Sequence, residues 1–354
     1  MPEGERAALD TTILLFLLQD GITNGAIYAL LGLALVLVFA VTRVILIPQG
    51  EFITYGALSY AMLAEGKIPG TALLAVGMGV VAFAFDMFSA RKAMHTRVVI
   101  RALLVDIVLP VAVFVLIRLL AGQHSSVGVN IALALLIVAP IGLYLYRIAF
   151  QPIAHTSVLV LLIASVGVHL AMQGFGLVFF GAEGLRGPAI SDAAMVAGPL
   201  RFTGQNIAVY GITVALIVAL WLLFGYTLYG RALRATAVNR LGARLVGIRT
   251  SLSGQAAFLL AALIGGISGI LIVPITTLYY DSGFLIGLKG FVAAIIGGLV
   301  SYPVTAGAAL VVGLVEAFSS FYASNFKEVI VFTLLIPVLM LRSVAAPEVE
   351  EEKD

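Results

Sequence analysis

Long apolar runs, separated by short breaks, dominate this chain and exclude most soluble folds. Each run is close to the length of about 20 residues that an α-helix needs to cross a bilayer. Hydrophobic residues make up 62% of the 354 residues and charged residues only 11%. A soluble domain of this composition could not bury its apolar surface. We therefore expect an all-α, polytopic membrane helix bundle.

The breaks between the runs predict about 10 or 11 spans. They form one transmembrane domain over residues 1–354, and no second domain is indicated. The expected spans are 11–41, 50–65, 70–86, 101–121, 128–147, 157–180, 206–229, 253–279, 284–299, 303–321 and 326–342.

The distribution of Lys and Arg predicts which loops face the cytoplasm. When the spans alternate in direction, the loops that hold most of the basic residues fall on one side of the membrane. These loops lie at Arg43, 91–101, Arg147, 231–249 and 342–353. The positive-inside rule makes this side cytoplasmic and places the N-terminus outside.

Several functions are excluded by residues that the chain lacks. It has no Cys and only four scattered His, so a thiolate or histidine metal cluster is not expected. The glycine-rich string 265–269 lies in an apolar run without the Lys-Ser or Lys-Thr of a phosphate loop, so we expect no ATP binding by this chain. No nucleophile and base can be paired, which argues against an enzyme. The net charge of +2 does not indicate nucleic acid, because the basic residues flank membrane spans.

The loop Arg231 to Thr250 carries five arginines and no acidic residue. Its pattern predicts a short amphipathic helix along the membrane surface, ending at Gly247. The apolar positions are Leu233, Ala237, Leu241, Leu245 and Ile248, and the basic positions opposite are Arg234, Arg240 and Arg244. Such a helix fits a groove on a soluble partner. It equally fits a loop that only contacts anionic lipid.

Polar residues inside the spans are costly in lipid and indicate contacts or a pathway. Lys289 and Glu316 lie in neighbouring spans, and we expect them to form a structural ion pair. Asn24 and Tyr28 lie one helical turn apart beside the string 21–25, where the long first span either tilts strongly or breaks. We favour the break, with Asn24 and Tyr28 facing the cargo.

A second set of polar residues lies on other spans. Ser165, His169 and Gln173 follow one face of the run 157–180, as a pore lining or as interhelical hydrogen bonds. Gln49 and Glu51 lie at the start of the second span, where Glu51 also suits the positive end of a helix dipole.

Four stretches of the sequence resemble one family. Gly21 to Phe52 reads GITNGAIYALLGLALVLVFAVTRVILIPQGEF, and Gly230 to Ile248 reads GRALRATAVNRLGARLVGI. These stretches, with 288–318 and 322–342, resemble the membrane permeases of branched-chain amino-acid ABC importers, the Liv type, in the family's order. A weaker match covers 146–180.

The resemblance implies a non-catalytic permease in the bacterial or archaeal plasma (inner) membrane, in contact with membrane lipid. It implies ABC ATPase subunits that hold ATP and Mg, a second permease subunit, and a periplasmic or lipid-anchored substrate-binding protein. It makes 231–250 the segment that couples to the ATPase. The coupling residues are then Arg234, Leu241, Ala243, Arg244, Leu245 and Gly247, and the pathway candidates are Asn24, Tyr28, Gln49, Ser165 and His169.

This chain departs from the family in three places. Leu46 and Gln49 replace the Asn and His of the family's N-F-A-H-G-E, and Leu241 replaces the Glu of a Glu-Ala-Ala in the coupling segment. Residues from about 71 to 145 are longer than the family's connection, and an acidic tail occupies 347–354. An ion-driven secondary carrier remains the alternative, although it would be expected to place more acidic or His residues at mid-membrane.

Overall fold

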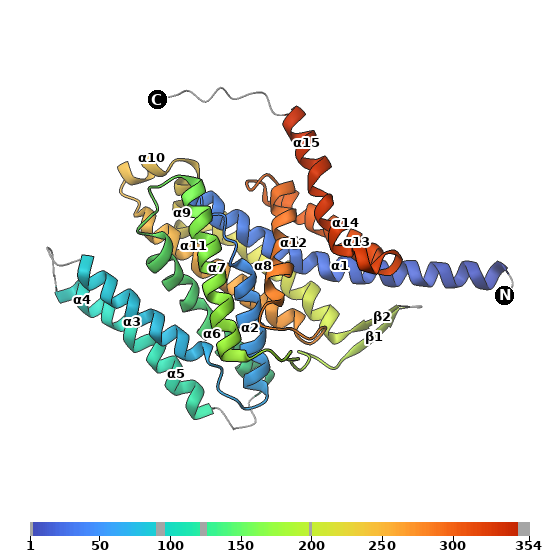
Figure 1. Ribbon diagram of the computed structural model, residues 1–354, viewed down its shortest axis with the longest axis horizontal. Helices are drawn as coiled ribbons and strands as arrows, with labels where there is room; N and C mark the ends of the chain where they lie inside the picture. Colours follow the sequence, from blue (N-terminus) through green and yellow to red (C-terminus); the bar gives the residue numbers. More distant parts are fainter. Residues whose placement is uncertain (1–2, 90–95, 121–125, 198–199, 346–354) are drawn as a thin grey trace.

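The computed structural model describes residues 3–89, 96–120, 126–197 and 200–345, and it is almost entirely helical (Figure 1). The acidic tail 347–354 and most of the basic loop 91–101 lie outside the described side chains. In chain order the α-helices are α1 (Glu3–Thr42), α2 (Gln49–Ala64), α3 (Thr71–Ser89), α4 (Thr96–Leu103), α5 (Leu109–Leu120), α6 (Val127–Leu145), α7 (Val158–Phe180), α8 (Gly204–Tyr226), α9 (Leu228–Val238), α10 (Arg240–Leu245), α11 (Thr250–Ile272), α12 (Ser282–Ile296), α13 (Tyr302–Tyr322), α14 (Lys327–Thr333) and α15 (Leu335–Ala345).

Smaller elements connect these helices. The turns η1 (Leu104–Val108) and η2 (Tyr146–Phe150) are π-helical, and η3 (Ser324–Phe326) is a 3₁₀ turn. The strands β1 (Ala194–Ala197) and β2 (Leu200–Thr203) pair antiparallel, with Ala194 opposite Thr203.

Eight helices in the described part of the chain are long and apolar enough to cross a membrane, which confirms the expected polytopic bundle. They coincide with eight of the expected runs, and the other three runs differ from a simple span. The run 101–121 is divided by the π-helical turn η1. Helices α2 and α12 have 16 and 15 residues. At about 1.5 Å per residue, both are shorter than a hydrocarbon core of about 30 Å.

Helix α1 is continuous through residues 21–25, so the break that we favoured there is wrong. The glycines instead allow α1 and α13 to pack backbone against backbone. A methyl group on Gly25 would fall 2.8 Å from the Cα of Leu310, and one on Gly313 would fall 2.6 Å from the Cα of Gly25. Small residues serve close helix contact in lipid in just this way. The long first span runs as one unbroken helix across the bundle (Figure 1).

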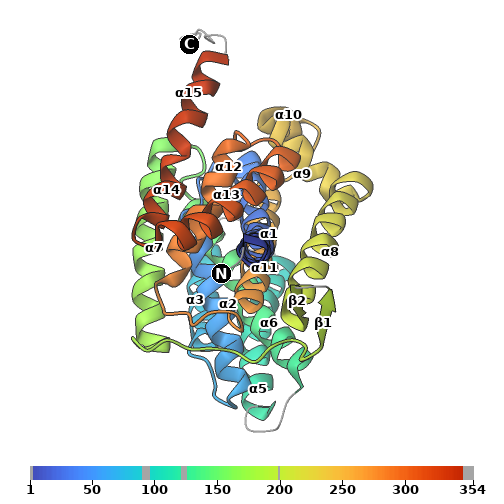
Figure 2. The ribbon, with the colours of Figure 1, turned by 90° about the vertical axis from the view of Figure 1, so that its right-hand side faces the viewer.

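The core of the bundle is formed by α1, α2, α11 and α13, with α6 and α12 packed beside them. Helices α7 and α8 lie on opposite flanks (Figure 2) and expose most of their surface. The helices α3, α4 and α5 of the expected insertion form a separate layer at the edge of the bundle (Figure 1). The helices at the centre of the bundle are therefore both its most buried helices and the ones that carry the central polar residues.

The basic loops gather at one end of the bundle. Arg43 lines the same cavity as Arg234 of α9, and Arg147 lines the same cavity as Arg249. We call this the basic end. The strands β1 and β2 lie at the opposite end, where the side-chain amide of Gln19 donates to the carbonyl of Arg201 at 3.1 Å. Alternating the direction of successive spans predicted that these arginines lie on one side, and the structure confirms this grouping.

Candidate functional site

The segment 231–250 forms two short helices where we expected one. Asn239 ends α9 and caps α10, because its Oδ1 accepts a hydrogen bond from the amide of Gly242 at 2.8 Å. A capping residue satisfies the free amides of a new helix. Gly247 has a φ of +86°, which glycine adopts without strain, and the chain leaves α10 there. The predicted end of the segment is confirmed and the single helix is wrong.

The turn at Asn239 divides the apolar positions of this segment between two directions. Leu233 and Ala243 are buried at 3% and 4% exposure and pack on the bundle. Leu241 and Leu245 are 68% and 81% exposed. The predicted continuous stripe from Leu233 to Ile248 therefore does not form. With the exposed Val238 and Val246, the two leucines make an apolar tip on α10, which we call the coupling tip.

The arginines of the segment serve two different purposes. Arg240 donates to the carbonyl of Ala154 at 3.1 Å, and the Nε of Arg244 donates to the Oγ1 of Thr250 at 3.0 Å. These bonds attach α10 to the loop before α7 and to the start of α11. Arg234 is exposed on α9, in the wall of the cavity that Arg43 also lines. The coupling tip is therefore held rigidly and carries positive charge at its margin.

Lys289 and Glu316 form the ion pair that we expected, inside the bundle between α12 and α13. The structure adds two partners that the sequence did not indicate. The hydroxyl of Tyr28 donates to the other oxygen of Glu316, and Lys289 also lies 3.2 Å from an oxygen of Glu328. The side chains of Lys289 and Glu316 are only 6% and 10% exposed, so lipid could not solvate either charge. Each residue therefore compensates the buried charge of the other.

Asn24 and Tyr28 have different surroundings although they lie on one helical face. Tyr28 is 5% exposed and belongs to the ion-pair network. Asn24 lines a cavity of about 470 Å³, half polar, between α1, α8 and α13. Its other polar lining residues are Asp20, Thr23, Asn206, Glu316, Ser320 and Lys327. We call this the outer cavity, because its lining residue Asp20 follows Gln19, which bonds to Arg201 of β2.

Cysteines placed singly at positions 24 and 28 should report this difference, in a chain with no native Cys. Asn24→Cys should react with a small water-soluble maleimide, because Asn24 lines the outer cavity. Tyr28→Cys should react far more slowly, because Tyr28 is buried. The measurement is the labelling rate in membranes, with Leu30→Cys at 0% exposure as the unreactive control. Equal rates at 24 and 30 would contradict the assignment of the outer cavity.

The start of α2 brings together the remaining pathway candidates. The side-chain amide of Gln49 donates to the carbonyl of Ala261 in α11 at 3.1 Å, and the Oγ of Ser165 accepts from the amide of Ile47 at 2.9 Å. The Nδ1 of His169 lies 2.9 Å from the Oε1 of Glu51, at ion-pair distance but outside hydrogen-bond alignment. Ser165 therefore bonds to the segment before α2, and His169 makes an electrostatic contact with α2, so neither forms the interhelical hydrogen bond that was the alternative to a pore lining.

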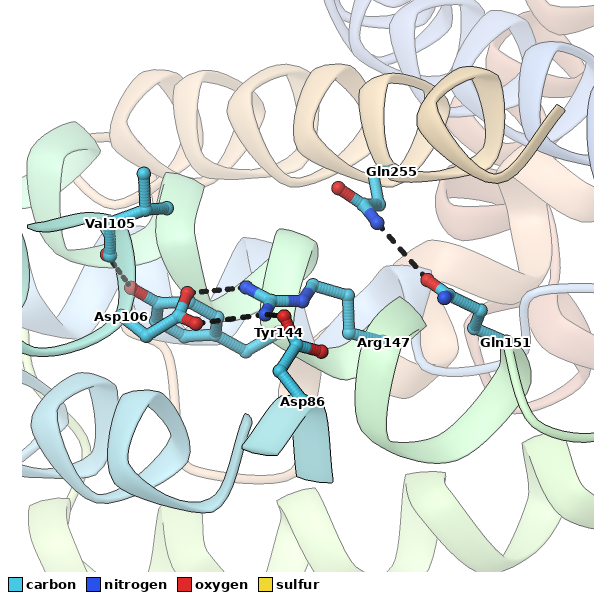
Figure 3. Close-up of polar contacts among 7 residues, drawn as sticks. All are labelled: Asp86, Val105, Asp106, Tyr144, Arg147, Gln151 and Gln255. Carbon is cyan, nitrogen blue, oxygen red and sulfur yellow. Dashed lines mark hydrogen bonds and ion pairs between the residues drawn. The ribbon is translucent and has the colours of Figure 1, made fainter. Parts of the chain in front are cut away.

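A further charged cluster joins the insertion to the rest of the bundle, and sequence reasoning did not identify it. Arg147 of η2 donates to both carboxylate oxygens of Asp106 in η1 and lies 2.6 Å from Asp86 of α3 (Figure 3). The hydroxyl of Tyr144 donates to the carbonyl of Val105 at 2.7 Å. Two acidic residues within apolar runs were the signal that could have revealed this cluster.

Replacing the two aspartates separately should have unequal effects. Asp106 is fully buried and bonds to Arg147 through both oxygens, so Asp106→Asn leaves Arg147 with only the part-exposed Asp86 and should cost up to about 3–5 kcal/mol of folding free energy. Asp86 is 43% exposed, and Asp86→Asn should cost about 1 kcal/mol or less. Thermal unfolding of the purified protein in detergent measures both. Equal shifts of the midpoint would mean that the two carboxylates share the charge of Arg147 evenly.

Comparison with known proteins gives consistent results. The family described as "Branched-chain amino acid transport system / permease component" matches residues 17–340. The LivH permease of the high-affinity branched-chain amino acid transport system of Escherichia coli K12 is 29% identical over 228 residues, which are 62% of this chain and 74% of that protein.

Two further relatives are more distant or shorter matches. The corresponding BraD permease of Pseudomonas aeruginosa is 27% identical over 62% of this chain and 75% of that protein. The LsrC permease of the autoinducer 2 import system of Yersinia enterocolitica is 30% identical over 39% of this chain and 38% of that protein. No solved structure matches the chain.

Proposed function

Because this chain belongs to the permease family of branched-chain amino acid transport systems, we propose that it forms the translocation pathway of an ABC importer for branched-chain amino acids or related small amino acids and amides. It is a multi-pass protein of the plasma membrane. In the proposed complex, separate ATPase subunits bind ATP and Mg and perform the hydrolysis, and this chain contributes no catalytic residue.

The observation that carries the proposal is the coupling tip at the basic end. Leu241 and Leu245 are 68% and 81% exposed on a short helix that also carries Arg240 and Arg244. An exposed apolar cluster edged by arginines fits a groove on a soluble subunit with an acidic margin. Contact with anionic lipid alone is the alternative for such a segment, and α10 lies at the end of the bundle, where a soluble subunit could reach it (Figure 1).

Hydrogen bonds supply a route by which movement of the tip would reach the core. The Oγ1 of Thr236 in α9 donates to the Oγ of Ser253 in α11 at 3.1 Å. Further along α11, the carbonyl of Ala261 accepts from Gln49 at the start of α2. A displacement of α9 and α10 on ATP binding would thus pull α11 and shift the start of α2, with its polar residues.

The proposal includes a second permease subunit and a substrate-binding protein. Helices α7 and α8 present long apolar faces that membrane lipid or the second permease would cover. The hairpin β1–β2 stands at the end opposite the tip and exposes Met195 and Val196, at 61% and 70%. It is therefore placed to meet a binding protein that delivers cargo to the outer cavity.

An ion-driven carrier is less well supported. Glu316 was the acidic residue best placed in the sequence to bind a coupling ion. In the structure, its carboxylate is occupied by Lys289 and Tyr28. A coupling ion would have to displace an ammonium group that is already bonded and buried.

Reconstitution tests the proposed function directly. The permease, its ATPases and a second permease are placed in proteoliposomes, with loaded binding protein outside. We expect uptake of radiolabelled leucine that requires ATP and Mg inside the vesicles. Uptake driven by a sodium or proton gradient without ATP would reject the ABC importer in favour of a secondary carrier.

A further inference from the structure

The chain between α1 and α2 is non-helical within the depth of the bundle. Residues 43–48 lack regular structure apart from a turn. The amide of Ile47 bonds to Ser165, which lies well inside the helix α7 (Val158–Phe180). Gln49 bonds to Ala261 at the middle of α11 (Thr250–Ile272). Non-helical backbone at membrane depth occurs where it is covered by protein or lines a cavity.

This segment does line a cavity, of about 300 Å³, which we call the inner cavity. The other walls come from α1, α7 and α12, and almost all of the accessible lining is aliphatic or aromatic. Representative lining residues are Leu35, Ile47, Val166, His169, Phe284 and Leu288. A volume of this size is at the lower end of the range for small-molecule sites, which is about 300–1,000 Å³.

Helices α2 and α12 both begin beside the inner cavity and cross through their glycines. A methyl group on Gly50 would fall 2.2 Å from the carbonyl oxygen of Gly283, and one on Gly287 would fall 2.8 Å from the Cα of Gly50. The amide of Gly283 donates to the Oγ1 of Thr54 at 3.0 Å. Two short helices that start within the depth of the bundle resemble the discontinuous helices that form substrate sites in transporters.

His169 supplies the polar side chain among the residues that line the inner cavity. Its ring stacks on Phe284 at 4.5 Å, and its Nδ1 faces the fully buried carboxylate of Glu51 at 2.9 Å. The two contacts hold the imidazole flat against the wall. The cavity therefore has a fixed shape on that side and remains apolar in character.

We propose that the inner cavity is the subsite for the aliphatic side chain of the cargo amino acid during translocation. The inference rests on the proposed function and adds to it the place where the side chain is recognised. A zwitterionic head cannot enter an apolar lining without a large desolvation cost, so it stays outside this lining while the aliphatic side chain enters it. The subsite accepts valine, leucine and isoleucine, and it disfavours amino acids with polar or aromatic side chains.

Changes of cavity volume test the proposal in the complete reconstituted transporter. Val166→Phe fills the cavity from α7, and Leu288→Ala enlarges it from α12. Leu170→Phe is the matched control, because Leu170 is 60% exposed on the same helix and does not line the cavity. Uptake of labelled alanine, valine, leucine and phenylalanine is measured for each variant, together with ATP hydrolysis. The same loaded binding protein serves every variant, so a changed ratio of uptake rates arises in the permease.

We expect Val166→Phe to lower the leucine-to-alanine uptake ratio by about 10-fold, a size typical of pocket discrimination between alkyl groups. Leu288→Ala should raise the phenylalanine-to-leucine ratio, and Leu170→Phe should leave all ratios as in the wild type. Unchanged ratios in the two cavity variants would overturn the subsite. If Val166→Phe does not assemble, the ratio in Leu288→Ala decides alone. A wild type that imports none of these amino acids would reject the proposed function itself.

Discussion

Replacement of Leu241 and Leu245 by aspartate is expected to release the ATPase subunits from the permease while the helix bundle remains folded. Both side chains are exposed, at 68% and 81%, so the bundle loses no packing when they change. In the proposed complex they enter an apolar groove, and burying two charges there costs several kcal/mol. Since about 1.4 kcal/mol is a factor of ten in affinity, the complex should dissociate at working concentrations. Co-purification of tagged permease with the ATPase measures the loss.

The matched control for this experiment is Val196→Asp. Val196 is 70% exposed, but it lies on β1 at the opposite end of the bundle. This variant should retain the ATPase, which separates a local effect at the coupling tip from a general effect of added charge. Full retention of the ATPase by the double variant would leave 231–250 as a loop that contacts lipid.

The losses of folding free energy from the single replacements of Lys289 and Glu316 are expected to sum to more than the loss from the double replacement. Lys289→Met leaves the carboxylates of Glu316 and Glu328 together without their cation, and it should cost about 3–5 kcal/mol. Glu316→Gln should cost less, because Lys289 keeps Glu328 at 3.2 Å. Loss of both partners leaves only Glu328, which is 34% exposed and has Lys327 at 4.0 Å, so the double variant should be more stable than the sum of the two effects predicts. Thermal unfolding in detergent measures all three.

Tyr28→Phe completes this series as the milder change. It removes the hydrogen bond to Glu316 and keeps the aromatic ring, so it should cost about 1.5–3 kcal/mol at most. If the effects of the two single replacements add without interaction, Lys289 and Glu316 do not act as a pair. If Tyr28→Phe costs more than Lys289→Met, the tyrosine is the main support of the network.

The sequence predicted the class of fold and much of the span pattern because both follow from local composition. A run of about 20 apolar residues has few stable alternatives to a spanning helix. The ion pair of Lys289 with Glu316 was also predictable, since a lone charge in a span needs a partner. The family was indicated by stretches such as 230–248, and the match over 17–340 shows it.

Glycines and short helices were less predictable. The glycines of 21–25 allow either a break or a close helix contact, and only the position of α13 beside α1 selects the contact. Asn239 is equally compatible with the middle of a weak helix and with a cap. Its capping bond to Gly242 directs Leu241 away from the bundle and leaves Leu233 facing it.

The sequence by itself therefore determined that this chain spans a membrane, where its basic loops lie, and that Lys289 and Glu316 need partners, because these properties depend on the free energy of single side chains in lipid. The tertiary structure alone decided which partners meet. Arg147 reaches Asp106 across 41 positions of sequence, and Tyr28 reaches Glu316 across 288. It also decided that α2 begins inside the bundle beside an apolar cavity. Contacts between distant segments depend on how helices pack, and no local pattern encodes that packing.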